Sequence, residues 1–406
     1  MKPLNLQKTV YSCGYLKNKG AWLLFAACFL LSITACSDQS ITTPETASSN
    51  DELISSNEIS PHSILGSNTS GKLTSLNKKR PNPGQNNGGG FTSPLFGLAT
   101  APNGDILVAD AGAGIATKDG FTDIPLPGIS GISPIGRGSL WAIKGLTEAP
   151  GDDTGQALYR ATKGKNRVIA DLFAFEETFN PDGAELIDSN PFDVQSLGGD
   201  AALVVDAGGN DLLRIDNQGN IEVVAVFPNE LVSTANIKNL LNCLPEPEDG
   251  LCTLPDMIPA QAVPTSVAIG PDGYYYVGEL KGFPAPTGAS NIWKIAPDAS
   301  GAMCGSSPKC EKVFDGGFTS IIDLAFDSEG NLHVAELDEQ SWFAVEILNP
   351  EDLGGTINSC DLSVKSCTEV AKGIPILTAI TFGNDGALWA TQNALIPRLA
   401  EVFEVK

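Results

Sequence analysis

The sequence predicts an all-β protein that folds as a six-bladed β-propeller. Short apolar runs alternate with turns rich in Gly, Asp and Asn, which is typical of antiparallel strands. The clearest unit runs from Pro264 to Ile295 and holds an apolar run, a Pro-Asp-Gly turn, an aromatic run, a loop and a third run. The unit recurs around six turn glycines: Gly104, Gly138, Gly199, Gly273, Gly330 and Gly386. Repeats spaced by tens of residues indicate a propeller or a solenoid rather than one mixed domain.

The first 35 residues are typical of a bacterial lipoprotein signal peptide. They contain no acidic residue, and a basic segment precedes an apolar run, 21–33, that is short for a membrane-spanning helix. The segment ends in Ile-Thr-Ala-Cys, which resembles the lipobox whose cysteine, here Cys36, is lipidated and becomes the mature N-terminus. The alternative is an ordinary secretory signal with an incidental cysteine.

Lipidation at Cys36 predicts a membrane anchor in the cell envelope. Ser37 follows the cysteine, which in the lipoprotein pattern favours the outer membrane over retention at the inner one. Residues 36–90 are rich in Ser, Thr, Asn, Gly and Pro, and because this composition cannot bury a core we expect a disordered tether. The chain therefore divides into a signal peptide (1–35), a tether (36–90) and a propeller (91–406).

Six cysteines follow the lipidation site, and we expect them to form three disulfide bonds. An even number of cysteines at short spacings is typical of disulfides in an exported chain. A structural zinc site needs CxxC spacing or histidine partners, and neither pattern occurs. Six cysteines allow 15 pairings. Because they come in close pairs that belong to different repeats, we expect the local pairs Cys243–Cys252, Cys304–Cys310 and Cys360–Cys367.

The chain is acidic, with a formal net charge of −23. Such a surface repels the phosphates of nucleic acids, so we expect no nucleic-acid partner. Solubility is the simplest explanation for most of the acidity. The only two histidines are His62, in the tether, and His333, which we expect to pack between blades. A Ser-His-Asp triad and a histidine-based metal site are therefore not expected.

The blades follow one another along the chain, and blade 3 is the clearest because it holds four strands in one run. The expected blades are blade 1 (91–128), blade 2 (131–144 with 157–172), blade 3 (190–227), blade 4 (264–295 with 310–314), blade 5 (319–372) and blade 6 (377–406). Blade 6 has only three expected strands. Propellers usually close with a strand from the other terminus, which removes the open edge. No strong strand precedes Phe91, so the sequence leaves the closure of the ring open.

Several segments resemble a known family. DAGGNDLLRID resembles the NHL-type blade, and the wider set resembles the ScyD/ScyE family, named for proteins of scytonemin biosynthesis in cyanobacteria. The matching segments are FEETFNPDG (175–183), DSNPFDV (188–194), DAGGNDLLRID (206–216), AVPTSVAIGPDGYYYVGELKGFP (262–284) and FTSIIDLAF (318–326). The resemblance covers the chain from about Leu95 to its end. It implies an exported six-bladed propeller of the NHL and SMP-30 kind, and it implies no established reaction. The lipobox, the long loop 229–261 and a degenerate blade 2 depart from the family pattern.

Acidic side chains recur where the second strand ends in blades 1, 3, 4 and 5, six or seven residues after the turn glycine, while Lys144 and Gln392 occupy this position in blades 2 and 6. Two more acids, Asp193 and Asp323, stand near the start of the innermost strands of blades 3 and 5. The start of the first strand and the end of the second lie at the same end of a propeller, so we expect one acidic mouth around the central channel. The expected ligand-binding residues are Asp110, Lys144, Asp193, Asp206, Asn210, Glu279, Asp323 and Glu336.

Three interpretations of these acids are open. A group of carboxylates suits a hard divalent cation, Ca²⁺ or Mg²⁺. Its expected ligands are Asp193, Asp206, Glu279, Asp323 and Glu336. A pair of carboxyl groups could instead exchange protons with a substrate. In the third interpretation each acid caps loop amides and bonds to the next blade. No P-loop or dinucleotide-binding fingerprint occurs.

The sequence therefore predicts a lipid-anchored propeller of the cell envelope that binds a small-molecule ligand or a protein partner at its acidic mouth. One alternative is a divalent-metal-dependent hydrolase of the lactonase kind, which rests on analogy between folds. Another is a purely structural envelope protein. We prefer the binding role because no catalytic motif is present, and the sequence does not name the ligand.

Overall fold

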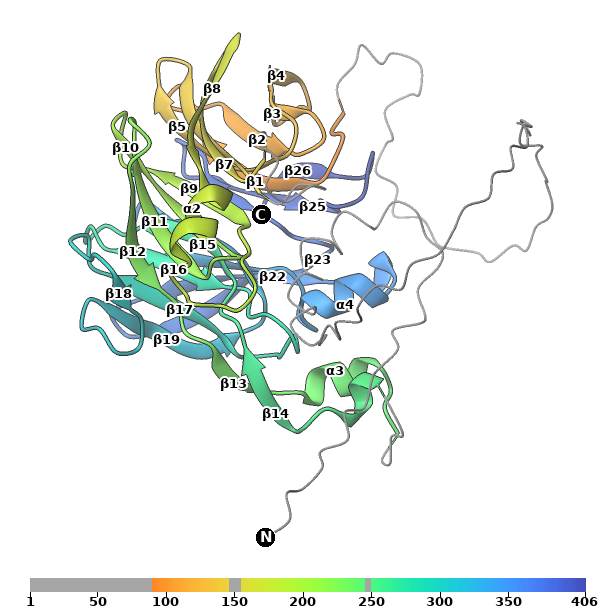
Figure 1. Cartoon of the computed structure of the whole chain (residues 1–406). Coiled ribbons are helices and arrows are strands. Elements are labelled where there is room, and N and C mark those ends of the chain that lie inside the picture. The colour runs from red at the N-terminus through yellow and green to blue at the C-terminus, as the bar shows by residue number, and fades with distance from the viewer. Residues whose placement is uncertain (1–89, 146–154, 245–249) are drawn as a thin grey trace, which may run out of the picture. The chain divides into compact units, whose positions relative to one another are not determined.

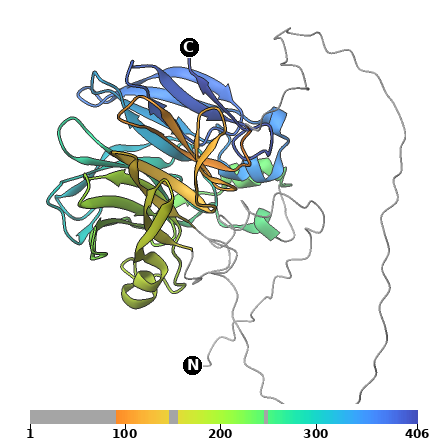
Figure 2. The same cartoon turned by 90° about the horizontal axis from the view of Figure 1, so that it is seen from above.

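The computed structural model describes residues 90–145, 155–244 and 250–406, and it shows a six-bladed β-propeller (Figures 1 and 2). In each blade the main strands are hydrogen-bonded in chain order, from an innermost first strand to an outermost last strand. The predicted all-β fold with six blades is confirmed. The expected signal peptide, Cys36 and the expected tether up to residue 89 lie outside the described residues.

The first three blades have four main strands each. Blade 1 consists of β1 (Leu95–Thr100), β2 (Ile106–Asp110), β3 (Gly114–Thr117) and β4 (Thr122–Pro125). Blade 2 consists of β5 (Ile129–Gly136), β6 (Ser139–Lys144), β7 (Ala157–Thr162) and β8 (Lys165–Asp171). Blade 3 consists of β9 (Pro191–Ser196), β10 (Ala201–Asp206), β11 (Asp211–Asp216) and β12 (Ile221–Val226).

The last three blades include the three-stranded one. Blade 4 consists of β15 (Pro264–Ile269), β16 (Tyr275–Glu279), β17 (Ser290–Ile295) and β19 (Cys310–Phe318). Its loop also supplies β18 (Ala302–Met303), which pairs in parallel with β12 of blade 3. Blade 5 consists of β20 (Ile321–Phe326), β21 (Leu332–Glu336), β22 (Gly355–Asp361) and β23 (Ser366–Ile374). Blade 6 consists of β24 (Ile380–Phe382), β25 (Leu388–Gln392) and β26 (Glu401–Glu404).

The second strand of a blade is a nearly continuous apolar run because neighbouring blades cover both of its faces. All five residues of β16 are buried, as are five of the six residues of β10. The outermost strand β8 is mostly exposed and carries polar residues. Burial on both faces thus explains why the second strands lack the polar–apolar alternation of a half-exposed sheet.

Long connections gather at one end of the propeller, where the first strand of a blade begins and the second ends. We call this end the loop face. Its helices are α2 (Leu172–Phe179), α3 (Ala235–Leu240), α4 (Trp342–Ile347), η2 (Gly250–Thr253) and η3 (Pro350–Asp352). The insertion 229–261 also carries a two-stranded ribbon, β13 (Glu230–Ser233) and β14 (Met257–Ala260). In both views α2 lies apart from α3 and α4 (Figures 1 and 2).

The ring closes by direct packing of blade 6 against blade 1. Within the described residues blade 6 has three strands, and no strand from before β1 joins it. The Leu95 amide donates to the Ala394 carbonyl at 2.9 Å, and the Thr100 hydroxyl donates to the Phe382 carbonyl at 2.6 Å. A shared apolar cluster covers the same joint. Side-chain packing and cross-blade hydrogen bonds therefore replace an exchanged strand.

The closing joint uses a device that recurs at two other joints. Thr378 of blade 6 donates its hydroxyl to the carbonyl of Leu95, which opens the innermost strand of blade 1. Ser130 of blade 2 donates to Pro191 of blade 3 in the same way, and Thr265 of blade 4 donates to Ile321 of blade 5. The same hydroxyl-to-carbonyl bond thus joins blades 2 and 3, blades 4 and 5, and blades 6 and 1, so the joint that closes the ring resembles two joints inside it.

All three expected disulfide bonds are present, Cys243–Cys252, Cys304–Cys310 and Cys360–Cys367. The first lies in the insertion 229–261, and each of the other two spans the connection between the third and fourth strands of a blade, at the end opposite the loop face. His333 packs against Phe382 of blade 6, with ring centroids 4.8 Å apart, as expected for a residue between blades. None of the helices among the described residues is long and apolar enough to cross a membrane.

Candidate functional site

Two of the predicted acids, Asp193 and Asp323, line the central channel. They are the first residues to pair after the register shift near the start of β9 and β20. The matching positions of blades 1, 2 and 4 hold small residues, Gly97, Gly131 and Ser266. The two carboxyl groups therefore stand on either side of Ser266, whose hydroxyl donates to Asp323 at 3.2 Å.

Both channel acids bond to the next blade around the ring. Asp193 accepts from the amide of Val267 in blade 4 at 2.9 Å, and Asp323 accepts from the amide of Ile380 in blade 6 at 2.7 Å. Burial raises the pKa of Asp193 to about 6. Burial, and then the charge of Asp193, raises the pKa of Asp323 well above its usual value. Burial and their mutual repulsion therefore disfavour the ionisation of both carboxyl groups together.

Three acids at the ends of second strands hold the segment that enters their own blade. Asp110 accepts from the amide of Thr92 at 2.7 Å, just before β1. Asp206 accepts from the amide of Asn190 at 2.6 Å, just before β9. Glu336 accepts from an amide just before β20, that of Thr319, and burial raises its pKa to about 7. These contacts match the third interpretation of the acids, in which they cap loop amides.

Glu279 belongs to a buried ion-pair network in blade 4. Its carboxylate lies 2.6 Å from Nζ of Lys281, and neither side chain is exposed. It also accepts from Nδ2 of Asn291 at 2.7 Å and from the indole of Trp293. Burial raises the pKa of Glu279, and Lys281 opposes that shift. The network satisfies both charges within the protein.

The same network anchors the insertion 229–261. Glu230, the first residue of β13, accepts from Nζ of Lys281 at 2.9 Å and from Nζ of Lys312 at 2.5 Å. Burial disfavours the Glu230 carboxylate, but hydrogen bonds from the two lysines lower its pKa to about 2. Sequence reasoning missed Lys281 and Glu230. A lysine two residues after Glu279, inside an otherwise apolar stretch, was the available signal.

The remaining two predicted residues have local partners. Lys144 lies over the ring of Tyr159, with Nζ 5.4 Å from the ring centroid. Asn210 has a positive φ of 50° in the turn between β10 and β11. Its side chain donates to Asp182 at 3.0 Å and accepts from the amide of Val263, at the entrance to blade 4, at 3.0 Å. The eight predicted residues are thus spread over several places rather than gathered in one cluster.

Asp206 lies in a second group of acids that sequence reasoning did not assemble. We call the group the blade 3 acidic cluster, and its members are Glu176, Asp182, Asp188, Asp206 and Asp211. Glu176 is on the buried side of α2, and Asp211 begins β11. All five acids fall in the segments 175–183, 188–194 and 206–216, which carry the resemblance to the ScyD/ScyE family. The fold brings these three segments together beside the turn that contains Gly209.

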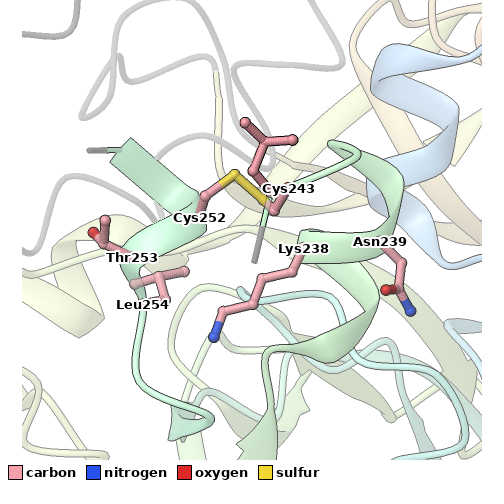
Figure 3. Close-up of a pocket in the computed structure, with 7 residues that line it drawn as sticks. Lys238, Asn239, Cys243, Cys252, Thr253 and Leu254 are labelled. Carbon is pink, nitrogen blue, oxygen red and sulfur yellow. A yellow bond between two sulfur atoms is a disulfide. The ribbon is translucent and has the colours of Figure 1, made fainter. Parts of the chain in front are cut away.

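The insertion 229–261 also carries a shallow hollow, drawn in Figure 3. Its volume is about 430 Å³, and the disulfide Cys243–Cys252 forms part of its wall. The other lining residues are Lys238, Asn239, Leu244, Thr253 and Leu254. The lining residues include one basic side chain, Lys238, and no acidic one, so the wall holds no pair of acid and base.

Comparisons with known proteins find distant structural similarities. No family model matches the chain, and no curated protein matches its sequence. A streptogramin B lyase structure is 18% identical, with 76% of this chain and 79% of that chain covered, at a TM-score of 0.41. A calcium-binding regucalcin from Agrobacterium tumefaciens is 13% identical, with 74% and 82% covered, at a TM-score of 0.44. A gluconolactonase-like structure is 13% identical, with 79% and 92% covered, at a TM-score of 0.41. Similarities this distant transfer neither a ligand nor a reaction to this chain.

Proposed function

We propose that this chain is an exported, lipid-anchored propeller of the ScyD/ScyE type that binds a protein partner on its loop face and catalyses no reaction. The observation that supports the proposal most is the apolar outer face of the β13–β14 ribbon. Because this chain is strongly acidic, we expect the partner to carry basic residues around the apolar patch with which it covers the ribbon.

The exposed face of the ribbon follows from its register. Leu231 pairs with Pro259 and Ser233 pairs with Met257, so these four side chains share one face. Leu231 is 68% exposed and Met257 is 50% exposed. The opposite face of the ribbon holds Val232 and Ala260, which are buried. Large apolar side chains held outwards on a folded ribbon are typical of a contact surface.

The ribbon is held rigidly on the propeller. Glu230, at its base, bonds to Lys281 and Lys312 of blade 4. Asn236 donates to the carbonyl of Ala285 at 2.7 Å and to the carbonyl of Gln340 at 3.0 Å. Because these contacts already order the ribbon, the ribbon loses little conformational freedom when a partner binds.

Binding is favoured over catalysis because the predicted acids already bond to other groups of the protein. Asp193 and Asp323 bond to neighbouring blades, and Asp206 and Glu336 hold the loops that enter their blades. Glu279 neutralises Lys281. A general base must reach the proton that it abstracts, and these carboxylates are already engaged by donors of the protein itself.

The test of the partner proposal is cross-linking in intact cell envelopes with the anchored protein. The double variant Leu231→Asp with Met257→Asp should lose at least about 80% of the adducts seen with the wild type, because two charges on the contact face must be desolvated. The matched control is Val364→Asp. Val364 is also 68% exposed but lies in the β22–β23 turn at the opposite end of the propeller. Equal adducts from all three proteins, or none from the wild type, would contradict the proposal.

The anchor and the location have a separate test. The Ile-Thr-Ala-Cys motif and the tether-like composition of residues 36–90 support an outer-membrane lipoprotein. Mass spectrometry of the N-terminal peptide should find a diacylglyceryl group on Cys36. Cys36→Ser should move the protein from the membrane fraction to the soluble fraction. A native chain that starts at another residue without lipid would rule the anchor out.

A further inference from the structure

The blade 3 acidic cluster contains carboxylate oxygens that have no partner. Both oxygens of Asp211 and Oε1 of Glu176 are buried without a hydrogen bond. Asp211 is 0% exposed and Glu176 is 1% exposed. Buried carboxylates are almost always bonded to donors or to metal ions. These two groups therefore need an explanation that the fold alone does not give.

The cluster also lacks a positive charge. Burial, and then the charges of Asp206, Asp182 and Asp188, raises the pKa of Glu176 to about 8. Burial, and then Asp206, Glu176 and Asp182, raises the pKa of Asp211 well above its usual value. In the part of the chain that the structure describes, none of the five acids pairs with a lysine or arginine.

The backbone at Gly209 lets Glu176 approach Asp206 and the β10–β11 turn closely. A Cβ atom on Gly209 would lie 2.5 Å from Oε1 of Glu176 and 3.5 Å from Cγ of Asp206, so a larger residue there would displace the carboxyl end of Glu176. Helix α2 holds Glu176 in this place, because Asp171 caps its first turn by accepting from Ala174 at 2.9 Å. Glu176 shares the buried helix face with Leu172, where an apolar residue would normally stand.

We propose that blade 3 binds one calcium ion between α2 and the β10–β11 turn, with Glu176 and Asp211 as ligands. Asp182 lies beside them, but its two oxygens already accept from the amide of Ala184 and from Asn210, so it could serve as a third ligand only after giving up one of these bonds. Asp206 is a positioning residue, because its two oxygens already accept from Ser189, Asn190, Gly208 and Gly209. The ion would join the loop between β8 and β9 to the second hairpin of the blade.

Calcium fits this place better than magnesium. The available donors are oxygens, which hard cations prefer. Mg²⁺ keeps several of its waters, whereas Ca²⁺ accepts irregular shells of protein oxygens. The two unpartnered side chains are buried, and burial favours the ion that gives up water more readily. Asp182 and Asp188 are only half-buried, so solvent reaches this side of the cluster.

Binding requires a small adjustment of the side chains. Among the described residues, no three Asp, Glu, His or Cys side chains already stand in a metal-holding arrangement. Asp182 and Asp188 lie on an irregular segment between α2 and β9, whose side chains can rotate without breaking a strand. Like charges that repel one another stay apart until a cation draws them together.

The test uses the full-length protein, stripped with EDTA and then titrated with Ca²⁺ or Mg²⁺. We expect about one calcium retained per chain and a rise in the thermal midpoint of roughly 2–5 °C at saturation. Magnesium should give a smaller rise. Asp211→Asn and Glu176→Gln should each weaken calcium affinity by at least about tenfold, since each removes a charged ligand.

The matched control is Glu346→Gln. Glu346, on α4, also has a buried oxygen without a partner but lies outside the cluster, so this variant should bind calcium like the wild type. The double variant Asp193→Asn with Asp323→Asn should do the same. If that double variant loses calcium while Asp211→Asn keeps it, the ion sits in the channel and the proposal is wrong. A wild type that retains no calcium and ignores both chelator and calcium also overturns it, and the acids are then neutral carboxyl groups. Neither result bears on the β13–β14 ribbon.

Discussion

Blades 3 and 4 both bury acidic side chains, but the charges around those side chains differ. In both, an acid at the end of the second strand lies where a long insertion joins the blade, Asp206 in blade 3 and Glu279 in blade 4. In blade 4 the buried acid faces Lys281, and Glu230 of the insertion bonds to the same lysine. In blade 3 the neighbours of the buried acids are further acids, and Asp211 has no partner.

The comparison shows how a buried charge is balanced when the chain supplies the opposite charge and when it does not. In a fully bonded ion-pair network each charged group already has a partner, so no group is left to bind a ligand. An unbalanced group of carboxylates either holds protons or takes up a cation from solution. The predicted cation ligand Glu279 therefore lies in the wrong environment for an ion, whereas Asp206 lies next to residues that suit one.

The largest expected effect is on blade 4. Lys281→Met should destabilise the protein by about 3–5 kcal/mol, because it leaves Glu279 buried beside Glu230 without its counter-charge. Thermal and denaturant unfolding measure the loss. The double variant Glu279→Gln with Lys281→Met should recover most of it, since no buried charge then remains unpaired. If Lys281→Met alone is as stable as the wild type, the network does not hold the insertion.

The next effect contrasts the two blades directly, in EDTA. Glu279→Gln should lower the stability by about 1–3 kcal/mol, because Lys281 loses a buried partner. Asp211→Asn, which also replaces a fully buried acid by its amide, should lower it by less than about 0.5 kcal/mol or raise it, since no bond is lost. Unfolding curves of both variants in the same buffer decide the point. An equal loss in both variants would mean that Asp211 has a stabilising partner inside the protein.

The smallest effect concerns Glu346 and pH. Burial alone raises its pKa to about 7, above the usual value of 4.5. The folded state therefore holds the proton more tightly. Its contribution to stability is fully present below about pH 4.5 and is lost as the pH rises through about 7. Glu346→Gln should reduce the loss of unfolding free energy over this pH range by less than about 1 kcal/mol, because water reaches part of the side chain. Midpoints measured from pH 5 to 8 test this, and an unchanged slope would show that Glu346 titrates normally.

Much of the architecture follows from the sequence by itself. The turn glycines and the alternation of apolar runs with turns predict six blades, because strand and turn preferences act over a few neighbouring residues. The disulfides Cys304–Cys310 and Cys360–Cys367 could be predicted for the same reason, since each pair closes one short loop. The resemblance segments also marked where the blade 3 acids would be, although not that they face one another.

Tertiary structure alone decided how the charges are shared. Glu230 and Lys281 are 51 residues apart, and Glu176 and Asp211 come from different elements, so no local pattern shows that they meet. The closure of the ring was decided in the same way, because the contacts of Thr378 with Leu95 join opposite ends of the propeller sequence. Spacing predicts which acids lie at the ends of strands, but the pKa of a buried acid depends on the neighbours that the fold brings to it. For that reason the sequence determined the blades of this protein, and only the folded chain determined which of its acids are paired.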